Sequence, residues 1–278
     1  MRGQLTASQS EVFAANRAAG GVAFDIQSID GKSRLRNLHE HGSLRVRFPS
    51  PEGEGLSAML VNTAGGVAGG DRFDIDVTAG ANSRITLTTA SAEKIYRSHG
   101  PDAAINVKLR VGDGACLAWV PQETILFNHA RVSRTIDIEL DDHATLLLSE
   151  IVVFGRAAMQ ETMSEGSYTD RWRMHRGGKL IFAETVRLRE DIAPKLRKSA
   201  IAKGGVAVGT ALIAPGNEAV VERIRTLQDS FSGEVGISCW NGFAMARFCA
   251  QDAAAVRADM MAVLMQAGIA PLPRIWLQ

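Results

Sequence analysis

The 278-residue chain has few of the features that mark specialised protein classes. Its three cysteines form no Cys-x-x-Cys pair, and their odd number argues against a disulfide framework and for a reducing compartment. A formal net charge of +1 provides no polybasic face for nucleic acid or for an acidic membrane. The most apolar stretch, residues 146–154, is far shorter than the roughly 20 residues of a membrane span. These absences predict a cytoplasmic protein that binds neither nucleic acid nor membranes.

The N-terminus also lacks the pattern of a secretion signal, because Glu11 and Arg17 fall where an unbroken apolar segment would be needed. Hydrophobic residues make up 46% of the chain and charged residues 22%, which is typical of a globular protein with an ample core. We expect one domain over residues 1–278, with a flexible segment at residues 1–20.

Apolar and polar residues alternate with a period of two between about residue 22 and residue 190, a pattern typical of β-strands. The clearest series cover residues 44–48, 73–77, 105–111 and 136–140. Because no helical period separates these series, the pattern favours a large multi-sheet β-body over a βαβ fold. We expect this body to extend over about residues 22–213.

The last quarter of the chain, about residues 215–278, predicts a helix, a hairpin and a second helix. Asn217 can cap a helix whose apolar face reaches Leu227. Asn241-Gly242 is the strongest short signal for a β-hairpin turn. The second helix should cover residues 252–267. The predicted fold is therefore mainly β, with two α-helices near the C-terminus.

Residues 62–71 read Asn-Thr-Ala-Gly-Gly-Val-Ala-Gly-Gly-Asp and contain two glycine pairs, Gly65-Gly66 and Gly69-Gly70. Strand-like sequences flank this glycine run on both sides, so we interpret it as a crossing between strands that needs positive φ angles. It is not a phosphate loop, because no Gly-Lys-Ser/Thr follows and the GGxxGG spacing differs from GxGxxG. The N–H groups of adjacent glycines could still form an anion site, which keeps a phosphate-binding enzyme as an alternative.

Four carboxylates share the phase of apolar neighbours on the expected strands: Asp71, Glu150, Glu161 and Glu184. If these segments are strands, the four side chains point toward apolar surroundings. An isolated buried carboxylate is costly, so each must be neutral, paired or facing an internal wet space.

Two arrangements would satisfy these carboxylates. Taken singly, each could pair with a buried arginine such as Arg97 or Arg156. Taken together, the four exceed what one or two arginines can satisfy, which favours an internal polar cavity or channel. Oxygen ligands in such a channel suit a divalent cation that moves without being trapped. His39 and His41 form a further possible metal pair, on one face of a segment that we expect to be exposed.

Several motifs occur in an order that resembles a known family. They are residues 62–71, 87–98 (LTTASAEKIYRS), 120–127 (VPQETILF), 144–150 (ATLLLSE) and 155–156 (GR). As a set, within about residues 22–190, they resemble the urease accessory protein D family (called H in some bacteria), which assists nickel insertion into urease. The chain departs from this family at Asn62-Thr63-Ala64, where many members have a His-Pro-Pro-type sequence, so any role of that histidine is absent.

The resemblance implies a non-enzymatic maturation factor with a β-helix-like body and two helices. It implies a complex with the urease accessory proteins F and G on the urease apoprotein, arranged as a dimer of heteromers, in which G supplies nickel and GTP hydrolysis. It also implies that Ni²⁺ passes through an internal tunnel and that no cofactor is tightly bound. A pure scaffold, which links F and G to urease without passing metal, is the alternative.

The resemblance carries over to individual positions. Asp71, Glu150 and Glu161 are candidates for the transient nickel passage, and Glu184 joins them on its strand phase. The other residues of the matching motifs are expected to be structural: Gly65, Gly66, Gly69, Gly70, Tyr96, Arg97, Glu123 and Arg156.

Overall fold

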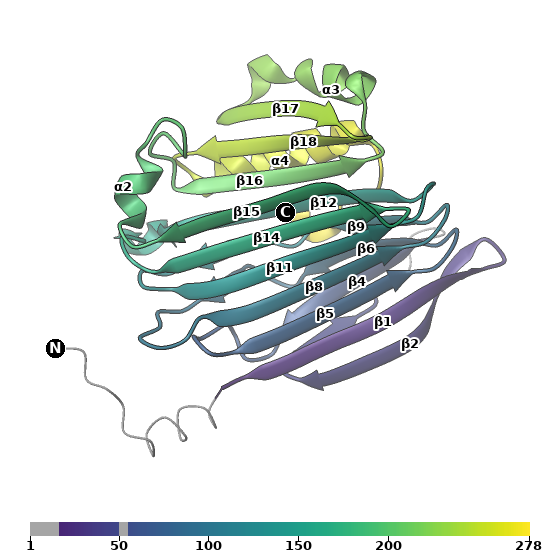
Figure 1. Ribbon diagram of the computed structural model, residues 1–278, viewed down its shortest axis with the longest axis horizontal. Helices are drawn as coiled ribbons and strands as arrows, with labels where there is room; N and C mark the ends of the chain where they lie inside the picture. Colours follow the sequence, from purple (N-terminus) through teal and green to yellow (C-terminus); the bar gives the residue numbers. More distant parts are fainter. Residues whose placement is uncertain (1–16, 50–54) are drawn as a thin grey trace.

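The computed structural model describes residues 17–49 and 55–278, which form mainly β-strands (Figure 1). One sheet contains seven strands: β1 (Ala19–Ile29), β2 (Lys32–Gly42), β5 (Arg72–Ala79), β8 (Ala103–Val111), β11 (Arg131–Leu140), β14 (Ser167–Arg176) and β15 (Lys179–Arg189). Their order across the sheet is β15-β14-β11-β8-β5-β1-β2.

The second sheet contains eleven strands. Eight of them form the path β17 (Glu234–Trp240), β18 (Phe243–Ala250), β16 (Ala207–Ala214), β12 (Thr145–Arg156), β9 (Cys116–Trp119), β6 (Arg84–Thr89), β4 (Leu56–Asn62) and β3 (Leu44–Arg47). Three short strands attach to this path: β7 (Glu93–Ile95), β10 (Thr124–Leu126) and β13 (Glu161–Thr162).

The chain winds between the two sheets as the coils of a β-solenoid, passing from β5 to β6, from β8 to β9 and from β11 to β12. Parallel pairing in the seven-stranded sheet aligns Val77, Leu109, Ile138 and Met174 in one ladder, and all four are buried. Side chains of both sheets share one hydrophobic core. Alternating inward residues dictate this packing, since each strand must bury one face. The predicted β-helix-like body is confirmed.

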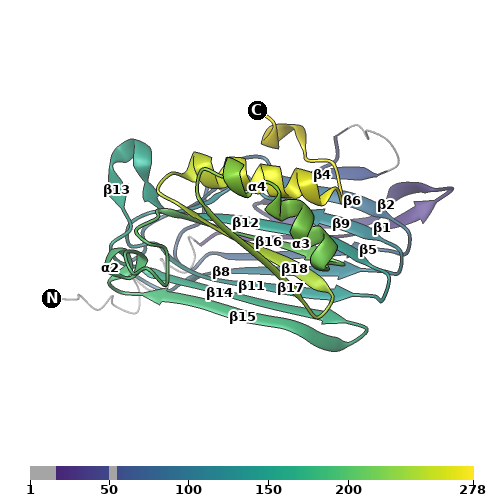
Figure 2. The same ribbon diagram turned by 90° about the horizontal axis from the view of Figure 1, so that it is seen from above.

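A second core lies on the opposite face of β12, which is buried on both sides. Helix α4 (Ala253–Ala267) covers β12, β16 and β18, and helix α3 (Glu218–Arg225) lies beside it over β17 (Figure 2). The phase of β12 therefore divides its residues between two cores: Leu148 faces the space between the sheets, and Leu147 faces α4.

The C-terminal predictions are confirmed with small differences. The Asn217 side chain accepts the N–H of Val220 at 3.1 Å, and the turn at Asn241-Gly242 has the positive φ angles of +48° and +80° that this dipeptide favours. Helix α3 ends at Arg225, so Leu227 lies beyond it. The short helix α2 (Ile192–Leu196) was not predicted.

The N-terminal prediction is partly wrong. The expected flexible segment at residues 1–20 extends too far, because Ala19 and Gly20 already belong to β1. The remainder of that segment, up to residue 16, lies outside the described residues. Among the described helices, none combines the length and the apolar character that crossing a membrane requires.

Candidate functional site

The glycine run joins β4 of one sheet to β5 of the other, as predicted, and Asp71 fixes the end of this crossing. One Asp71 carboxylate oxygen accepts the backbone N–H of Ala18 at 2.9 Å, and the other accepts that of Ala68 at 2.7 Å. Asp71 is buried, yet it lines neither of the two interior cavities described below. Its carboxylate therefore shapes the loop and faces neither of these cavities.

The glycines permit close packing around the crossing. At Gly66, with φ of +154°, a Cβ would lie 2.4 Å from the Tyr96 ring, whose hydroxyl donates to the Gly65 carbonyl at 2.8 Å. At Gly69 a Cβ would lie 1.8 Å from Ser98 Oγ. Backbone N–H groups in the run that already donate to oxygen atoms of the protein include those of Thr63, Ala64, Gly65, Val67, Ala68 and Asp71. These bonds use amides that an anion site would need.

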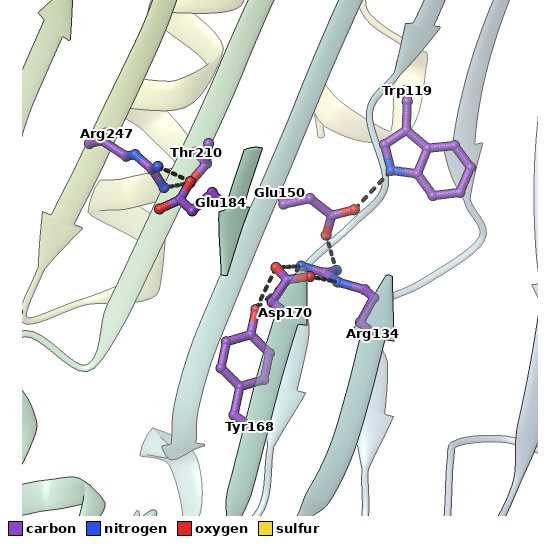
Figure 3. Close-up of polar contacts among 8 residues, drawn as sticks. All are labelled: Trp119, Arg134, Glu150, Tyr168, Asp170, Glu184, Thr210 and Arg247. Atoms are coloured by element: carbon purple, nitrogen blue, oxygen red, sulfur yellow. Dashed lines mark hydrogen bonds and ion pairs between the residues drawn. The ribbon is translucent and has the colours of Figure 1, made fainter. Parts of the chain in front are cut away.

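A buried arginine links the two sheets in the interior (Figure 3). Arg134 of β11 and Asp170 of β14 are paired in register, and Arg134 Nε and Nη2 donate to the two Asp170 oxygens at 3.0 Å and 2.6 Å. Arg134 Nη1 donates to Glu150 Oε2 on β12 of the facing sheet. Trp119 Nε1 of β9 donates to the other Glu150 oxygen at 2.8 Å. Together with Tyr168, these residues form the Arg134 cluster.

Burial and pairing set the protonation of this cluster. Burial raises the pKa of the Glu150 carboxyl, and the Arg134 guanidinium and the Trp119 N–H offset part of that rise. Burial alone would lower the pKa of Arg134, but the carboxylates of Asp170 and Glu150 hold it well above its ordinary value. The Tyr168 hydroxyl donates to Asp170 at 2.9 Å, and burial raises its pKa well above the usual range. Arg134 and Tyr168 thus keep their protons.

Two cavities meet at the Arg134 cluster. The first cavity, of about 230 Å³, is lined mostly by apolar side chains and includes Asn62 and Glu93. The second cavity, of about 690 Å³, is lined by Asp170 and Glu184 among others. Arg134 and Glu150 line both cavities, so a single ion pair stands between the two spaces.

Glu93 is an acidic group of the first cavity that the sequence analysis missed. Asn62 Nδ2, at the start of the glycine run, donates to both Glu93 oxygens at 3.2 Å and 3.3 Å. Burial raises the pKa of Glu93, and the hydrogen bond from Asn62 offsets part of that rise. Within the described part of the chain, no arginine, lysine or histidine nitrogen lies within ion-pair distance of this carboxylate.

Glu184 faces the second cavity, as its phase on β15 predicts. Arg247 Nη2 donates to Glu184 Oε2, and Arg247 Nη1 donates to Thr210 Oγ1 at 2.8 Å (Figure 3). A β-bulge between Leu180 and Phe182 breaks the expected alternation, so Leu180 points outward and is 48% exposed. The inward face of β15 therefore begins at Phe182.

Glu161 lies apart from both cavities. The expectation that Glu161 shares a strand phase with inward apolar neighbours, here Met159 and Met163, is wrong. Residues 157–159 form a 3₁₀ turn that leaves Met159 66% exposed while Met163 is buried. Arg156 Nε and Nη2 donate to the Glu161 carboxylate at 2.6 Å and 3.1 Å. The Arg156 guanidinium also stacks on the Phe127 ring at 4.1 Å. The Arg156–Glu161 ion pair therefore stabilises the turn at residues 157–159.

The structural motif residues have the following contacts. Glu123 accepts a hydrogen bond from Arg257 of α4 at 2.9 Å and so ties the helix to the solenoid. Arg97 is exposed and Arg156 is half-buried, so neither is the buried arginine suggested by the sequence. That residue is Arg134.

The histidine pair lies on the exposed edge strand β2, as expected, with the rings of His39 and His41 5.6 Å apart. Over residues 17–49 and 55–278, no group of three or more His, Cys, Asp or Glu side chains converges as a metal site. The carboxylates that line the two cavities are Glu93 in the first, Glu150 in both, and Asp170, Glu184 and Glu234 in the second.

A signal for the missed residues was present in the sequence. Arg134 shares the phase of Val132, Ile136 and Ile138 on β11, and Asp170 shares that of Trp172 on β14. The strand period that turns Glu150 inward also turns the side chains of Arg134 and Asp170 inward.

Comparison with known proteins identifies the family. The family model described as UreD urease accessory protein matches residues 18–277. A urease accessory protein UreD of Bradyrhizobium diazoefficiens is 65% identical over 277 residues, which cover all of both chains. A urease accessory protein UreD of Rhodopseudomonas palustris strain BisA53 is 65% identical over 272 residues, or 98% of this chain and 95% of that protein. The chain belongs to the UreD urease accessory protein family.

Membership in the UreD family implies a role in urease maturation, and the resemblance found in the sequence is confirmed. The relatives are named accessory proteins, which is consistent with a role other than catalysis. In this UreD chain, carboxylates line both cavities, and Arg134 and Glu150 border the two spaces together.

Proposed function

We propose that this protein guides Ni²⁺ between its two sheets during urease maturation, in a complex with the urease accessory proteins F and G on the urease apoprotein. The observation that carries the proposal is the junction of two cavities at one buried ion pair, Arg134–Glu150. A cation that enters either cavity meets carboxylate oxygen at this junction. We also expect the complex to be a dimer of heteromers, as the resemblance implies.

The carboxylates along the cavities support transit. Glu93 lies in the first cavity, Glu150 at the junction, and Glu184 in the second cavity. Single oxygen ligands bind a borderline divalent cation weakly, whereas three or four converging ligands would hold it. Asp71 and Glu161 are left out of the proposed route, because their oxygens are bonded to backbone N–H groups and to Arg156 respectively.

The test is co-expression of the full chain with the urease subunits and accessory proteins F and G in limiting nickel. Glu150→Gln keeps the shape and the hydrogen bond from Trp119 while it removes the charge. We expect this variant to be recovered in the complex and to yield urease with several-fold less nickel. The matched control is Glu139→Gln, an exposed carboxylate on the outer face of β11 that lies 3.8 Å from Arg110. Its urease should contain normal nickel.

A second variant separates passage from scaffolding. Val208 lies half-buried on the wall of the second cavity, so Val208→Trp should narrow that space. Passage predicts nickel-poor urease with the complex intact. Normal nickel content with both Glu150→Gln and Val208→Trp would overturn the passage and leave the scaffold interpretation.

A further inference from the structure

Arg134 occupies the position that a cation would take between two buried carboxylates. Its guanidinium donates to Asp170 from one sheet and to Glu150 from the other, so it bridges the sheets through charge (Figure 3). The third neighbour, the Tyr168 hydroxyl, accepts a longer hydrogen bond from Arg134 Nη2 at 3.3 Å. Two carboxylates thus share the one guanidinium.

The two carboxylates hold Arg134 unequally. Asp170 accepts two hydrogen bonds in the bidentate geometry that matches a guanidinium, whereas Glu150 accepts one. The other Glu150 oxygen is held by Trp119. A cation arriving at Glu150 therefore has to displace a single contact, and Arg134 can remain anchored on Asp170 throughout.

We propose that Arg134 is a tethered cation that competes with the metal for Glu150 and so prevents the metal from staying in the passage. The inference rests on the proposed function, because it assumes that metal reaches Glu150. Without Arg134, a dication between Glu150 and Asp170 would be fully neutralised in a buried site and would be retained. With Arg134 present, the returning guanidinium restores the ion pair and releases the metal.

The test is a gain of metal binding in the purified full-length chain. In Arg134→Gln the two carboxylates lose their resident cation, and the new amide adds another oxygen ligand. We expect this variant to retain about one Ni²⁺ per chain after equilibrium dialysis, under conditions where the wild type retains none. Ni²⁺ should also raise the Tm of the variant and leave that of the wild type unchanged.

Matched controls make the readout specific. Arg110 also bridges two carboxylates, Asp76 and Glu139, but on the exposed outer face of the seven-stranded sheet. Arg110→Gln should retain no Ni²⁺, because solvent screens the exposed pair. The double variant Arg134→Gln/Asp170→Asn should lose the nickel gained by Arg134→Gln. Nickel retention equal to that of the wild type in Arg134→Gln, or unchanged retention in the double variant, would overturn the inference.

Arg134→Lys decides the question if Arg134→Gln does not fold. Lysine keeps the charge but cannot form the bidentate bond to Asp170 while reaching Glu150. We expect Arg134→Lys to bind Ni²⁺ about tenfold more tightly than the wild type, a difference of about 1.4 kcal/mol. Equal affinity would contradict the inference.

The two proposals can fail separately. If Arg134→Gln retains nickel while Glu150→Gln and Val208→Trp both mature urease normally, the competition for Glu150 stands and the passage fails. If Glu150→Gln yields nickel-poor urease while neither Arg134 variant gains affinity, the passage stands and Arg134 has only a structural role.

Discussion

Asp71 and Glu150 are equally buried, at 4% exposure each, but their surroundings differ. Asp71 closes the glycine run, where both oxygens accept backbone N–H groups. Glu150 lies between two cavities, where its partners are a guanidinium and an indole N–H from two other strands. Backbone donors have fixed positions and leave the carboxylate no freedom, whereas a long arginine side chain can move.

The difference shows that burial of a carboxylate does not identify a site by itself. Asp71 is satisfied by a loop that cannot rearrange without unfolding locally. Glu150 is satisfied by a contact that another cation could replace. The accessible space next to the group and the mobility of its partner decide which of the two can act on an ion.

The largest expected effect tests the partner of Glu150. Arg134→Leu leaves two carboxylates buried without their cation, so we expect the free energy of unfolding to fall by about 3–5 kcal/mol. Denaturant unfolding of the full chain measures this loss. Arg110→Leu removes an exposed arginine with the same kind of partners and should change stability little. Equal decreases in unfolding free energy in the two variants would show that burial of the Arg134 cluster adds nothing to its contribution to stability.

The next effect tests Asp71 as a loop carboxylate. Asp71→Ala leaves the N–H groups of Ala18 and Ala68 without their acceptors, at a cost of about 1–3 kcal/mol in unfolding free energy. The folded variant should still yield urease of normal nickel content. Asp74→Ala, which removes a half-buried carboxylate from β5, the strand that follows Asp71, is the stability control. Nickel-poor urease from a folded Asp71→Ala variant would place Asp71 on the route and erase the contrast with Glu150.

A smaller effect separates the remaining predicted carboxylates by their access to the cavities. Urease nickel content should fall less with Glu184→Gln than with Glu150→Gln, because Glu184 lines only the second cavity whereas Glu150 lines both. Glu161→Gln, which affects a turn away from both cavities, should have no effect. Metal analysis of urease from the three co-expressions measures this order. A loss with Glu161→Gln as large as with Glu150→Gln would contradict the proposed route.

The smallest effect concerns Glu93, which connects the glycine run to the first cavity. Asn62 of the glycine run donates hydrogen bonds to the Glu93 carboxylate in that cavity. Burial raises its pKa in the folded state, so the folded protein binds this proton more tightly than the unfolded chain does. The contribution of Glu93 to the free energy of unfolding therefore decreases as the pH rises from the ordinary glutamate pKa through the raised pKa of Glu93. Glu93→Gln should therefore stabilise the protein at about pH 7.5 and have little effect at about pH 4.

Unfolding at the two pH values checks the prediction for Glu93. The matched control is Glu139→Gln, in which an exposed carboxylate is neutralised and the pH dependence should remain that of the wild type. A stabilisation by Glu93→Gln that is the same at both pH values would show that the charge of Glu93 is not its cause.

Much of the fold was accessible from the sequence. Strand alternation predicted the β-body, Asn241-Gly242 predicted the C-terminal hairpin, and Asn217 predicted the start of α3. The same alternation correctly turned Glu150 and Glu184 inward. It failed for Glu161, because the 3₁₀ turn at residues 157–159 interrupts the strand period.

The sequence by itself determined which face of the regularly alternating strands is buried, because the side-chain period of a strand is a local property of the backbone. Only the tertiary structure decided what each buried carboxylate meets. Glu150 and Asp170 lie 16 and 36 residues from Arg134 in the chain, and solenoid winding brings all three together between facing sheets. Such contacts depend on register across several coils, which no local pattern encodes. The placement of two cavities on either side of Arg134 and Glu150 has the same origin.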